Sequence, residues 1–495
     1  MKKKNEMILK LFFLILSVLF VMPSVIYLLR YKTVFGFCTY YNFFINDGAH
    51  KVLSSVLYLF IFICMSILYI LLVKNESIFK NIKQLLIYIA IVSVIFILML
   101  PWTSSDIFYY MGVGELDSVY NQNPYYVTME NFYGNSKEKI DDEILIQGAN
   151  NFWSNTIVVY GPVAQFIFKI LTKISFKNIN LCLIMFKIAN VLIHILNCYL
   201  IFKITKKMKF TLIYGLNPFI FIEFIGNVHN DIIVVFFILL SLHYLIDKKR
   251  ILPSLVFLSV ATGIKYFAIL LLPLVILYYI KDVKKIGKRI VKCIEYGIIF
   301  LVLYLLQYVM YYKDMTVLIS MGDQTQRYCK SIYSGLFSVA FINDKIKMLL
   351  DWNKLRVEAH KIVFCIFVYL YIVFCLKLLI KEKIDWNIEI KKYNFILIVF
   401  LLSLSNFQQW YLIWLFGTLM WQDKKMLKSI VCISLISEIA NSVYMFKIES
   451  WRYDYIFVMI IWGMFLIWTI LEKNSSLFKG KDLDYEKSKY NCAGL

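Results

Sequence analysis

The chain has 495 residues, of which 61% are hydrophobic and 17% are charged, and its net charge is +21 from 53 basic and 32 acidic residues. Ordinary soluble domains are about 45–50% apolar, so this composition excludes a soluble protein. Because charged residues are few, the apolar runs between them are long, which is typical of a protein that crosses a membrane many times.

Because about 20 apolar residues cross the hydrocarbon core of a bilayer, the hydropathy of the sequence predicts about 14 membrane-spanning segments. These segments lie at residues 8–29, 52–73, 84–101, 179–202, 210–225, 231–247, 251–263, 266–280, 290–312, 360–380, 393–406, 411–422, 428–446 and 455–472. We therefore expect an all-α polytopic membrane protein with about 14 transmembrane helices.

The lysine and arginine bias of the short connections orients these segments, since basic connections stay in the cytoplasm. The basic clusters are Lys2–Lys4, Lys74–Lys83, Lys203–Lys209, Lys248–Arg250, Lys281–Lys292, Lys381–Lys392, Lys424–Lys428 and Lys473–Lys489. Both termini are then cytoplasmic, and the long connections 102–178 and 313–359 lie outside. The same bias explains the positive charge without a nucleic-acid partner.

One further apolar stretch, Val158–Phe176, is either a span or a helix that lies on the membrane surface. Its apolar residues recur at helical spacing, its polar residues occupy the opposite face, and Pro162 suits a first helical position. As a span it would place Lys203–Lys209 outside. We favour the interfacial helix, because it preserves the charge bias.

The first long outer connection carries a carboxylate directly after a predicted span. Ser104 or Ser105 can cap a helix whose first turn contains Asp106, where the helix dipole favours negative charge. Asp106 then lies at the outer mouth of the bundle. It is either a functional group or simply an acidic helix start.

A second polar group lies between two predicted spans that have almost no connection between them. It runs from Asn217 to Asp231 and contains Glu223, Asn227, His229, Asn230 and Asp231. Ionisable groups held at this boundary are functional candidates, because burying them in hydrocarbon costs about 2.5–3.5 kcal/mol. His229 and Asp231 could be metal ligands, a hydrogen-bonded pair or helix caps. No cysteine or third carboxylate stands at ligand spacing, so we expect no metal and no other cofactor.

Three later positions add candidate binding groups on the same outer side. Lys265 interrupts an apolar stretch, and it either snorkels to the surface or supplies a positive charge for a phosphate. Arg327 is a possible partner for it. Gln409 and Trp410 suit sugar hydroxyls and ring faces, although an interfacial aromatic belt contains the same residue types.

In their order and shared outer position, these motifs resemble the GT-C glycosyltransferases that use polyprenyl-phosphate sugars, most closely the polyprenyl-phosphomannose-dependent α-mannosyltransferases. The resemblance rests on Ser105-Asp106, Tyr110, Gly114, Asn123-Pro124-Tyr125, Tyr160-Gly161-Pro162, Asn217-Pro218, Gly226–Asp231, Gly263-Ile264-Lys265 and Gln409-Trp410-Tyr411. It implies a GT-C-like membrane domain over 84–472 with interfacial helices in its first outer loop. Two extra spans in 1–83 would precede it, and a polar cytoplasmic tail at 473–495 would follow.

The resemblance also implies a function, that of a membrane-bound hexosyltransferase of the cell envelope. It would move a hexose, most simply mannose, from a polyprenyl-phosphate donor to an extracytoplasmic glycan or glycolipid acceptor. Asp106 would be the general base, and Lys265 with Arg327 would bind the donor phosphate. Substrates would contact Glu115, Tyr110, Tyr125, Tyr160, His229, Asn230, Asp231, Gln409 and Trp410. A single base suggests inversion, although Glu115 and Asp117 leave the stereochemistry open.

Two other functions stay open on the sequence. A flippase or transporter of lipid-linked sugars would also need outer polar groups, but transporters commonly have two related halves, and no such symmetry is evident here. A polymerase or ligase of surface polysaccharide typically carries essential basic residues in a late outer loop, where Arg327 and Arg356 lie.

Overall fold

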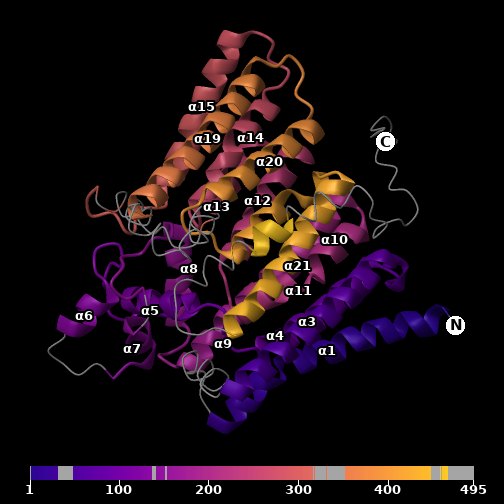
Figure 1. Cartoon of the computed structure of the whole chain (residues 1–495). Coiled ribbons are helices and arrows are strands. Elements are labelled where there is room, and N and C mark those ends of the chain that lie inside the picture. Colours follow the sequence, from indigo (N-terminus) through magenta and orange to yellow (C-terminus); the bar gives the residue numbers. More distant parts are fainter. Residues whose placement is uncertain are drawn as a thin grey trace.

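The computed structural model describes residues 2–31, 48–135, 141–150, 153–315, 352–446 and 460–465, with the single positions 317, 331 and 458. This part of the chain is helical and contains no β-strand. Long apolar helices run side by side, and the shorter helices α5–α8 gather beyond one end of them (Figure 1). The all-α fold class expected from the composition is therefore confirmed for the described residues.

The bundle consists of long helices and shorter helical pieces, which alternate along the chain. They are α1 (Lys2–Tyr31), α3 (Gly48–Lys74), α4 (Ile82–Ile97), α9 (Ile179–Thr205), α10 (Met208–Gly215), α11 (Pro218–Ile220), the π-helical turn η2 (Phe221–Gly226), α12 (Asp231–Ile246), α13 (Ile251–Thr262), the 3-10 helix η3 (Tyr266–Leu271), α14 (Leu272–Tyr279), α15 (Ile286–Leu306), α19 (Trp352–Ile380), α20 (Trp386–Ser403), the 3-10 helix η5 (Gln409–Trp421) and α21 (Lys424–Phe446). The connection between α4 and α9 folds into α5 (Asp106–Ser118), α6 (Met129–Asn135), α7 (Glu143–Ala149) and α8 (Pro162–Lys173).

Each apolar segment predicted up to residue 446 coincides with a helix or with a run of helical pieces, with ends shifted by several residues. Among the described residues, however, only four helices are long and apolar enough to cross a membrane alone, or five if one bent pair is a single span. Many of the other segments are short or broken, and α15 and α20 carry several charged residues. The count of about 14 spans is therefore not confirmed, whereas several apolar helices fit a membrane protein.

The bent pair is formed by α10 and the α11–η2 segment, which meet at 49°. The bend follows from Asn217-Pro218. Asn217 caps the second piece by accepting a hydrogen bond from the Phe219 N–H, and Pro218 begins the piece, where its missing N–H costs nothing. The chain then closes with a π-type bond from the Asn227 N–H to the Ile222 carbonyl, at 2.9 Å.

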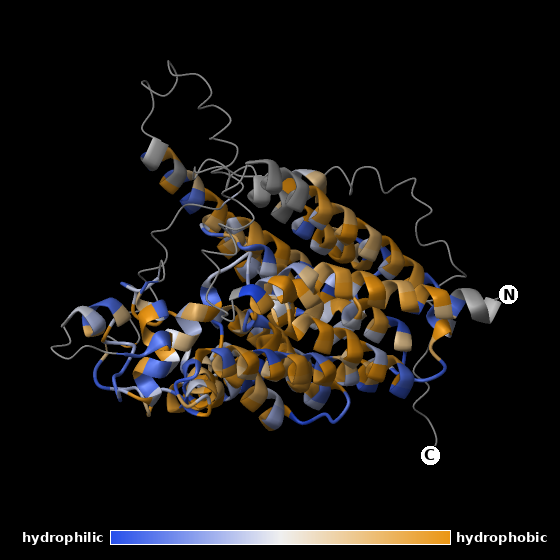
Figure 2. Ribbon diagram, turned by 90° about the horizontal axis from the view of Figure 1, so that it is seen from below, coloured by the Kyte–Doolittle hydropathy of each residue, from blue (hydrophilic) through white to orange (hydrophobic). Residues whose placement is uncertain are grey.

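The two ends of the bundle differ in chemistry. The lysine-rich connections α3–α4, α9–α10 and α12–α13 follow helices that run in alternating directions, so they share one end. The segments 98–105, 227–230 and 263–265 share the other end. Hydrophobic residues fill the middle of the bundle, and hydrophilic residues gather in the α5–α7 region and at helix ends (Figure 2). The predicted outer motifs around Asp106, His229 and Lys265 therefore lie at the end without the lysine clusters, whereas Asn217-Pro218, predicted at the same boundary, lies at the bend within the bundle.

Helix α8 begins at Pro162, as predicted, and its 12 residues are too few to cross a bilayer. Its apolar side chains Phe166 and Ile170 are 40% and 43% exposed. The polar Gln165 and Thr172 are buried, and Gln165 donates to the Val113 carbonyl of α5 at 3.1 Å. Gln165 and Thr172 therefore contact protein rather than water, Lys173 is exposed, and the apolar side chains Phe166 and Ile170 are open to a membrane surface.

A buried lysine in α9 joins the ends of two other helices. The Lys187 ammonium donates to the carbonyls of Met99 at 2.6 Å, Ile225 at 3.0 Å and Gly226 at 2.7 Å. These carbonyls follow α4 and close η2, where a helix leaves carbonyls without partners. All three donors of the ammonium are used, so this one side chain holds both helix ends together.

We predict that Lys187→Met destabilises the protein by about 3 kcal/mol or more, because three buried carbonyls lose their donor. Lys203→Met, near the C-terminal end of the same helix and partly exposed, should change stability by less than about 0.5 kcal/mol. The measurement is denaturant unfolding of each purified variant in detergent. Equal stabilities for the two variants would contradict this role of Lys187.

Candidate active site

The end of the bundle that faces α5–α8 contains a cavity of about 1270 Å³, a volume that includes its opening to the exterior. Its lining combines residues that are far apart in the sequence. Asp106 comes from α5, Tyr160 from the segment before α8, Lys265 from the turn between α13 and η3, and Trp410 and Tyr411 from η5. The cavity therefore brings four predicted site residues, namely Asp106, Tyr160, Lys265 and Trp410, to one surface.

Asp106 opens α5 and is held there by local capping. The Asp106 N–H donates to the Ser104 hydroxyl at 3.1 Å, whereas Ser105 makes no side-chain cap bond. Of the two predicted caps, the structure therefore selects Ser104. The Asp106 side chain is 15% exposed, and the positive end of the helix dipole stabilises its negative charge.

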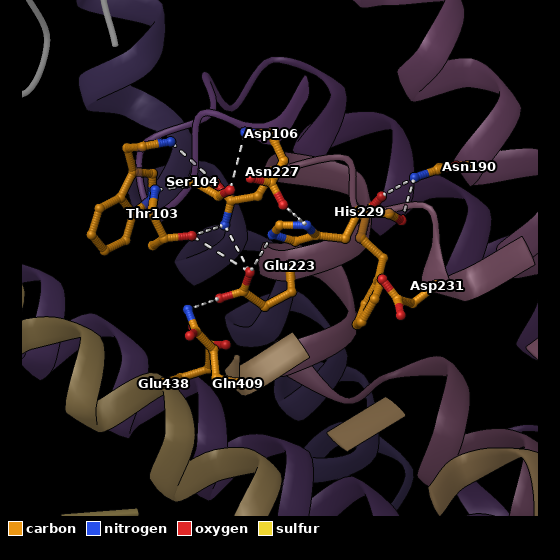
Figure 3. Close-up of polar contacts among 12 residues, drawn as sticks. Thr103, Ser104, Asp106, Asn190, Glu223, Asn227, His229, Asp231, Gln409 and Glu438 are labelled. Carbon is orange, nitrogen blue, oxygen red and sulfur yellow. Dashed lines mark hydrogen bonds and ion pairs between the residues drawn. The ribbon is translucent and has the colours of Figure 1, made fainter. Parts of the chain in front are cut away.

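His229 lies between two carboxylates. Its Nδ1 is 3.7 Å from Asp106 Oδ2, and its Nε2 is 3.3 Å from Glu223 Oε2 (Figure 3). The imidazole stacks on the Trp410 ring with centroids 3.7 Å apart. The imidazole therefore lies between the carboxylates of Asp106 and Glu223, and the stack on Trp410 sets the orientation of its ring.

Glu223 is fully buried in η2 and is held by amides. Gln409 Nε2 donates to Oε1 at 3.2 Å, and Asn227 Nδ2 donates to Oε2 at 3.3 Å. Asn227 Oδ1 in turn accepts from the Trp102 N–H at 3.1 Å, which ties the end of η2 to the segment that leads into α5. Glu438 of α21 lies beside Glu223 (Figure 3). Gln409 thus orients a buried carboxylate instead of facing the cavity.

The turn that delivers His229 is strained. Val228 has a φ of 65°, a left-handed conformation that a β-branched residue rarely adopts and that costs about 1–3 kcal/mol. Asn190 of α9 restrains this turn, because its amide donates to the Phe224 carbonyl at 2.7 Å and to the His229 carbonyl at 3.2 Å. Buried hydrogen bonds therefore maintain the strained conformation of this turn, and the turn directs the His229 side chain toward Asp106.

Lys265 forms a buried ion pair at the cavity wall. Its Nζ is 2.7 Å from both oxygens of Asp231, and the Trp414 indole N–H donates to the same carboxylate at 2.7 Å. Asp231 is fully buried, so this neutralisation is what allows it to stay inside the protein. The Lys265 ammonium also lies 4.5 Å from the centre of the Tyr411 ring.

Two glycines bring Lys265 next to α8. A Cβ on Gly161 would lie 2.3 Å from the Gly263 carbonyl oxygen, so only glycine permits this approach of the two backbones. The Val163 N–H donates to that same carbonyl at 2.9 Å. The motifs around Gly161 and Gly263, which are about 100 residues apart in the sequence, are therefore in direct contact.

The three predicted tyrosines support this region through hydrogen bonds to one another. The Tyr160 hydroxyl donates to that of Tyr110 at 3.2 Å, and the Tyr125 hydroxyl donates to the Tyr160 carbonyl at 2.8 Å. Burial raises the pKa of the Tyr110 and Tyr160 phenols well above the usual value, so both stay neutral hydrogen-bonding groups. Only Tyr160 of the three lines the cavity.

Three further predicted residues are not brought to the cavity wall. Glu115 is nine residues after Asp106, half a turn out of phase, so it faces Asp142 on the opposite side of α5. Asn230 is buried, and its amide has no hydrogen-bond partner among the described residues. Arg327 lies outside the described residues, as does most of the predicted loop 313–359.

Several residues that build the site were given no role from the sequence. Glu223 and Asn227 belong to the predicted polar group 217–231 but were not assigned a contact, and Lys187, Trp414 and Glu438 were not predicted at all. A signal existed for Lys187 and Glu438, because each is an isolated ionisable residue within an apolar segment, and such residues are rarely found in membrane helices without a role. For Trp414 the sequence offers no signal, since it is one of many aromatic residues in η5.

Comparison with protein families gives one match. A family model described as alpha-(1->6)-mannopyranosyltransferase, N-terminal domain, matches residues 21–281. This range runs from within α1 to the end of α14 and includes Asp106, Glu223, His229, Asp231 and Lys265. No curated protein and no solved structure matches the chain.

The buried carboxylate of Glu115 predicts a pH-dependent stability. Burial, and then the neighbouring Asp142 carboxylate, raises the pKa of Glu115 from 4.5 to about 8, and Lys177 opposes this shift. Between these values the folded chain binds a proton that the unfolded chain releases, so stability falls as pH rises through this window. We predict that Glu115→Gln abolishes this fall in stability. The difference in melting temperature between the variant and wild type should therefore increase by about 3 °C or more between pH 5 and pH 8.5.

Thermal unfolding in detergent across this pH range measures the effect. Glu143→Gln provides the control, because Glu143 is exposed at the start of α7, next to Asp142. This variant should keep the wild-type slope. Parallel curves for wild type and Glu115→Gln would refute the assignment.

Proposed function

The chain belongs to the alpha-(1->6)-mannopyranosyltransferase family of GT-C glycosyltransferases, and from this premise we propose that it transfers mannose from a polyprenyl-phosphate donor to a hydroxyl of an extracytoplasmic glycan or glycolipid. One observation carries the proposal. Asp106 and Lys265 line the same cavity, at the end of the bundle opposite the lysine-rich connections. By the charge bias of membrane proteins, this end faces away from the cytoplasm.

Asp106 is proposed as the general base. In the transfer, an acceptor oxygen attacks the sugar C1, the bond from C1 to the phosphate oxygen breaks, and the acceptor proton passes to the carboxylate. The exposure of Asp106 at the cavity lets an acceptor hydroxyl reach it. His229, 3.7 Å behind, holds the carboxylate in place and can accept the proton before the next cycle.

Lys265 is proposed to bind the donor phosphate. Two of its three ammonium donors are directed at Asp231, which leaves one donor for a phosphate oxygen. Asp231, itself held by Trp414, fixes the direction of this donor. The negative charge that builds on the departing phosphate would then be stabilised by a group that is already in position.

The carboxylates around the cavity favour inversion. A retaining reaction through a covalent intermediate needs a nucleophilic carboxylate at the sugar. Of the described residues that line the cavity, Asp106 is the only carboxylate. Glu115 faces Asp142, and Asp117 pairs with Lys169 of α8 at 2.7 Å, so neither reaches the sugar.

Aromatic side chains supply the remaining contacts of the proposed site. Phe267, Phe400, Tyr411 and Trp414 line the cavity as one stacked group, and we assign this apolar wall to the pyranose or to the first isoprene units of the donor. Trp410 stacks on His229 and also lines the cavity, so we assign it a substrate contact as well as support of the imidazole.

We predict that Asp106→Asn lowers transfer by about 10²–10⁴-fold, because the amide cannot accept the proton. The assay supplies membranes containing the protein with labelled polyprenyl-phosphate mannose and measures label in the acceptor fraction. The matched control is Asp117→Asn, on the same helix about 16 Å further along its axis. It should keep activity within about threefold.

The outcomes separate the candidate functions. Unchanged transfer by Asp106→Asn would remove this residue as the base. No transfer by wild type from any monophosphate donor would favour a flippase or a polysaccharide ligase instead. Equal losses in both variants would assign the effect to folding of α5 and would contradict a role for Asp106 in the reaction.

A further inference from the structure

The aromatic wall of the cavity continues into the contact between α19 and α20. Phe400 of α20 lines the cavity, and its ring centroid lies 6.2 Å from that of Trp414. The same ring lies 4.9 Å from Phe367 of α19, and Phe367 lies 5.9 Å from Phe364, one turn earlier in α19. Aromatic rings whose centroids are about 4.5–7 Å apart are in contact. An unbroken series of rings therefore runs from the cavity to α19.

This series of rings ends on the surface of the bundle. Phe364 is 43% exposed, whereas Phe367 is buried. Helix α19 runs beside α20 (Figure 1) and is long and apolar enough to cross a membrane. A smaller share of it is buried than of the other three described helices of this kind. Phe364 therefore lies on a face that is open to the bilayer.

The other end of the series lies beside Lys265. The Lys265 ammonium is 5.8 Å from the centre of the Trp414 ring and 4.5 Å from that of Tyr411, and Phe267 stacks on Trp414 at 3.8 Å. Lys265 is the group proposed to bind the donor phosphate. The rings thus connect a cation in the cavity with the lipid-facing surface of α19, which is the arrangement that a phosphate on a long hydrocarbon chain requires.

Contact with bulk lipid explains only part of this arrangement. It accounts for an exposed phenylalanine at the surface, since Phe395 of α20 is 55% exposed as well. It does not account for a series of rings that leads from such a position to a charged cavity. Both α19 and α20 lie outside residues 21–281, so the family match assigns no role to them.

We propose that the polyprenyl chain of the donor lies over the α19–α20 contact, against Phe400 and Phe364, and enters the bilayer there. Phe367 is buried between these two rings in the series and supports both. This inference rests on the proposed function, and it commits the aromatic wall to isoprene units. The apolar chains of a glycolipid acceptor are the competing occupant, and the test separates them from the donor.

The first test locates the chain by crosslinking. The full-length protein, with p-benzoylphenylalanine in place of Phe364 or of Phe395, is illuminated in liposomes that contain labelled polyprenyl phosphate. Phe395 is the matched control, because it is the same residue type and is at least as exposed, but lies on a different side of α20 from Phe400. Position 364 should crosslink about tenfold more label than position 395. Unlabelled polyprenyl phosphate should suppress this crosslink, and a diacyl glycolipid should not.

The second test compares donors of different chain length. The ratio of kcat/KM for a long-chain polyprenyl-phosphate mannose over that for a short-chain analogue should fall about tenfold in Phe364→Gln and stay within about twofold in Phe395→Gln. Melting curves verify the folding of both variants. If Phe364→Gln does not fold, Phe364→Leu should lower the same ratio about threefold, because the ring contact is lost while the surface stays apolar.

Equal crosslinking at the two positions, suppression by the glycolipid instead of polyprenyl phosphate, or an unchanged ratio in the folded Phe364 variant would each overturn the proposal. If wild type transfers mannose from neither donor, the proposed function fails. The crosslinking comparison then upholds or overturns the position of the chain by itself, because it uses a polyprenyl phosphate without a sugar.

Discussion

The structure of the bundle end that holds the cavity depends on one buried ammonium group. Lys187 holds the carbonyls that end α4 and η2, and from these two points the chain continues to Asp106 and to His229. Asn190, one turn later on α9, restrains the turn at His229 through the same kind of bond. A span that is bent at Asn217-Pro218 and closed by a π turn leaves carbonyls unpaired inside the membrane, and buried donors must satisfy them.

The ionisable residues of the site fall into two groups, one buried and one partly exposed. Glu223 and Asp231 are buried and paired, whereas Asp106 and Lys265 are partly exposed at the cavity. The buried carboxylates thus position the exposed groups, Glu223 through His229 and Asp231 directly on Lys265. In such a site only a few charged side chains would contact substrate, and a buried neighbouring group fixes the orientation of each of them.

Apolar runs and helix signals were sufficient to predict most helices, including the start of α8 at Pro162. The location of Asp106 at the end of the bundle opposite the lysine-rich connections also followed from the sequence. The contact between Gly161 and Gly263 did not, because it depends on how two backbones approach in space. Glu115 was assigned to substrate although its spacing from Asp106 puts it on the other face of α5, so helical periodicity, applied strictly, would have excluded it. The predicted number of spans stays unconfirmed, because polar turns divide several apolar runs into short pieces.

The central claim is that the outer cavity uses a lipid-linked sugar. The measurement that tests it most directly is donor use by the purified wild-type protein in liposomes, with labelled mannose supplied either as polyprenyl-phosphate mannose or as GDP-mannose. The proposed function predicts that the chain incorporates label only from the lipid donor, because the lysine bias would place the cavity on the side away from the cytoplasmic nucleotide pool. Incorporation from GDP-mannose, with none from the lipid donor, would contradict the account.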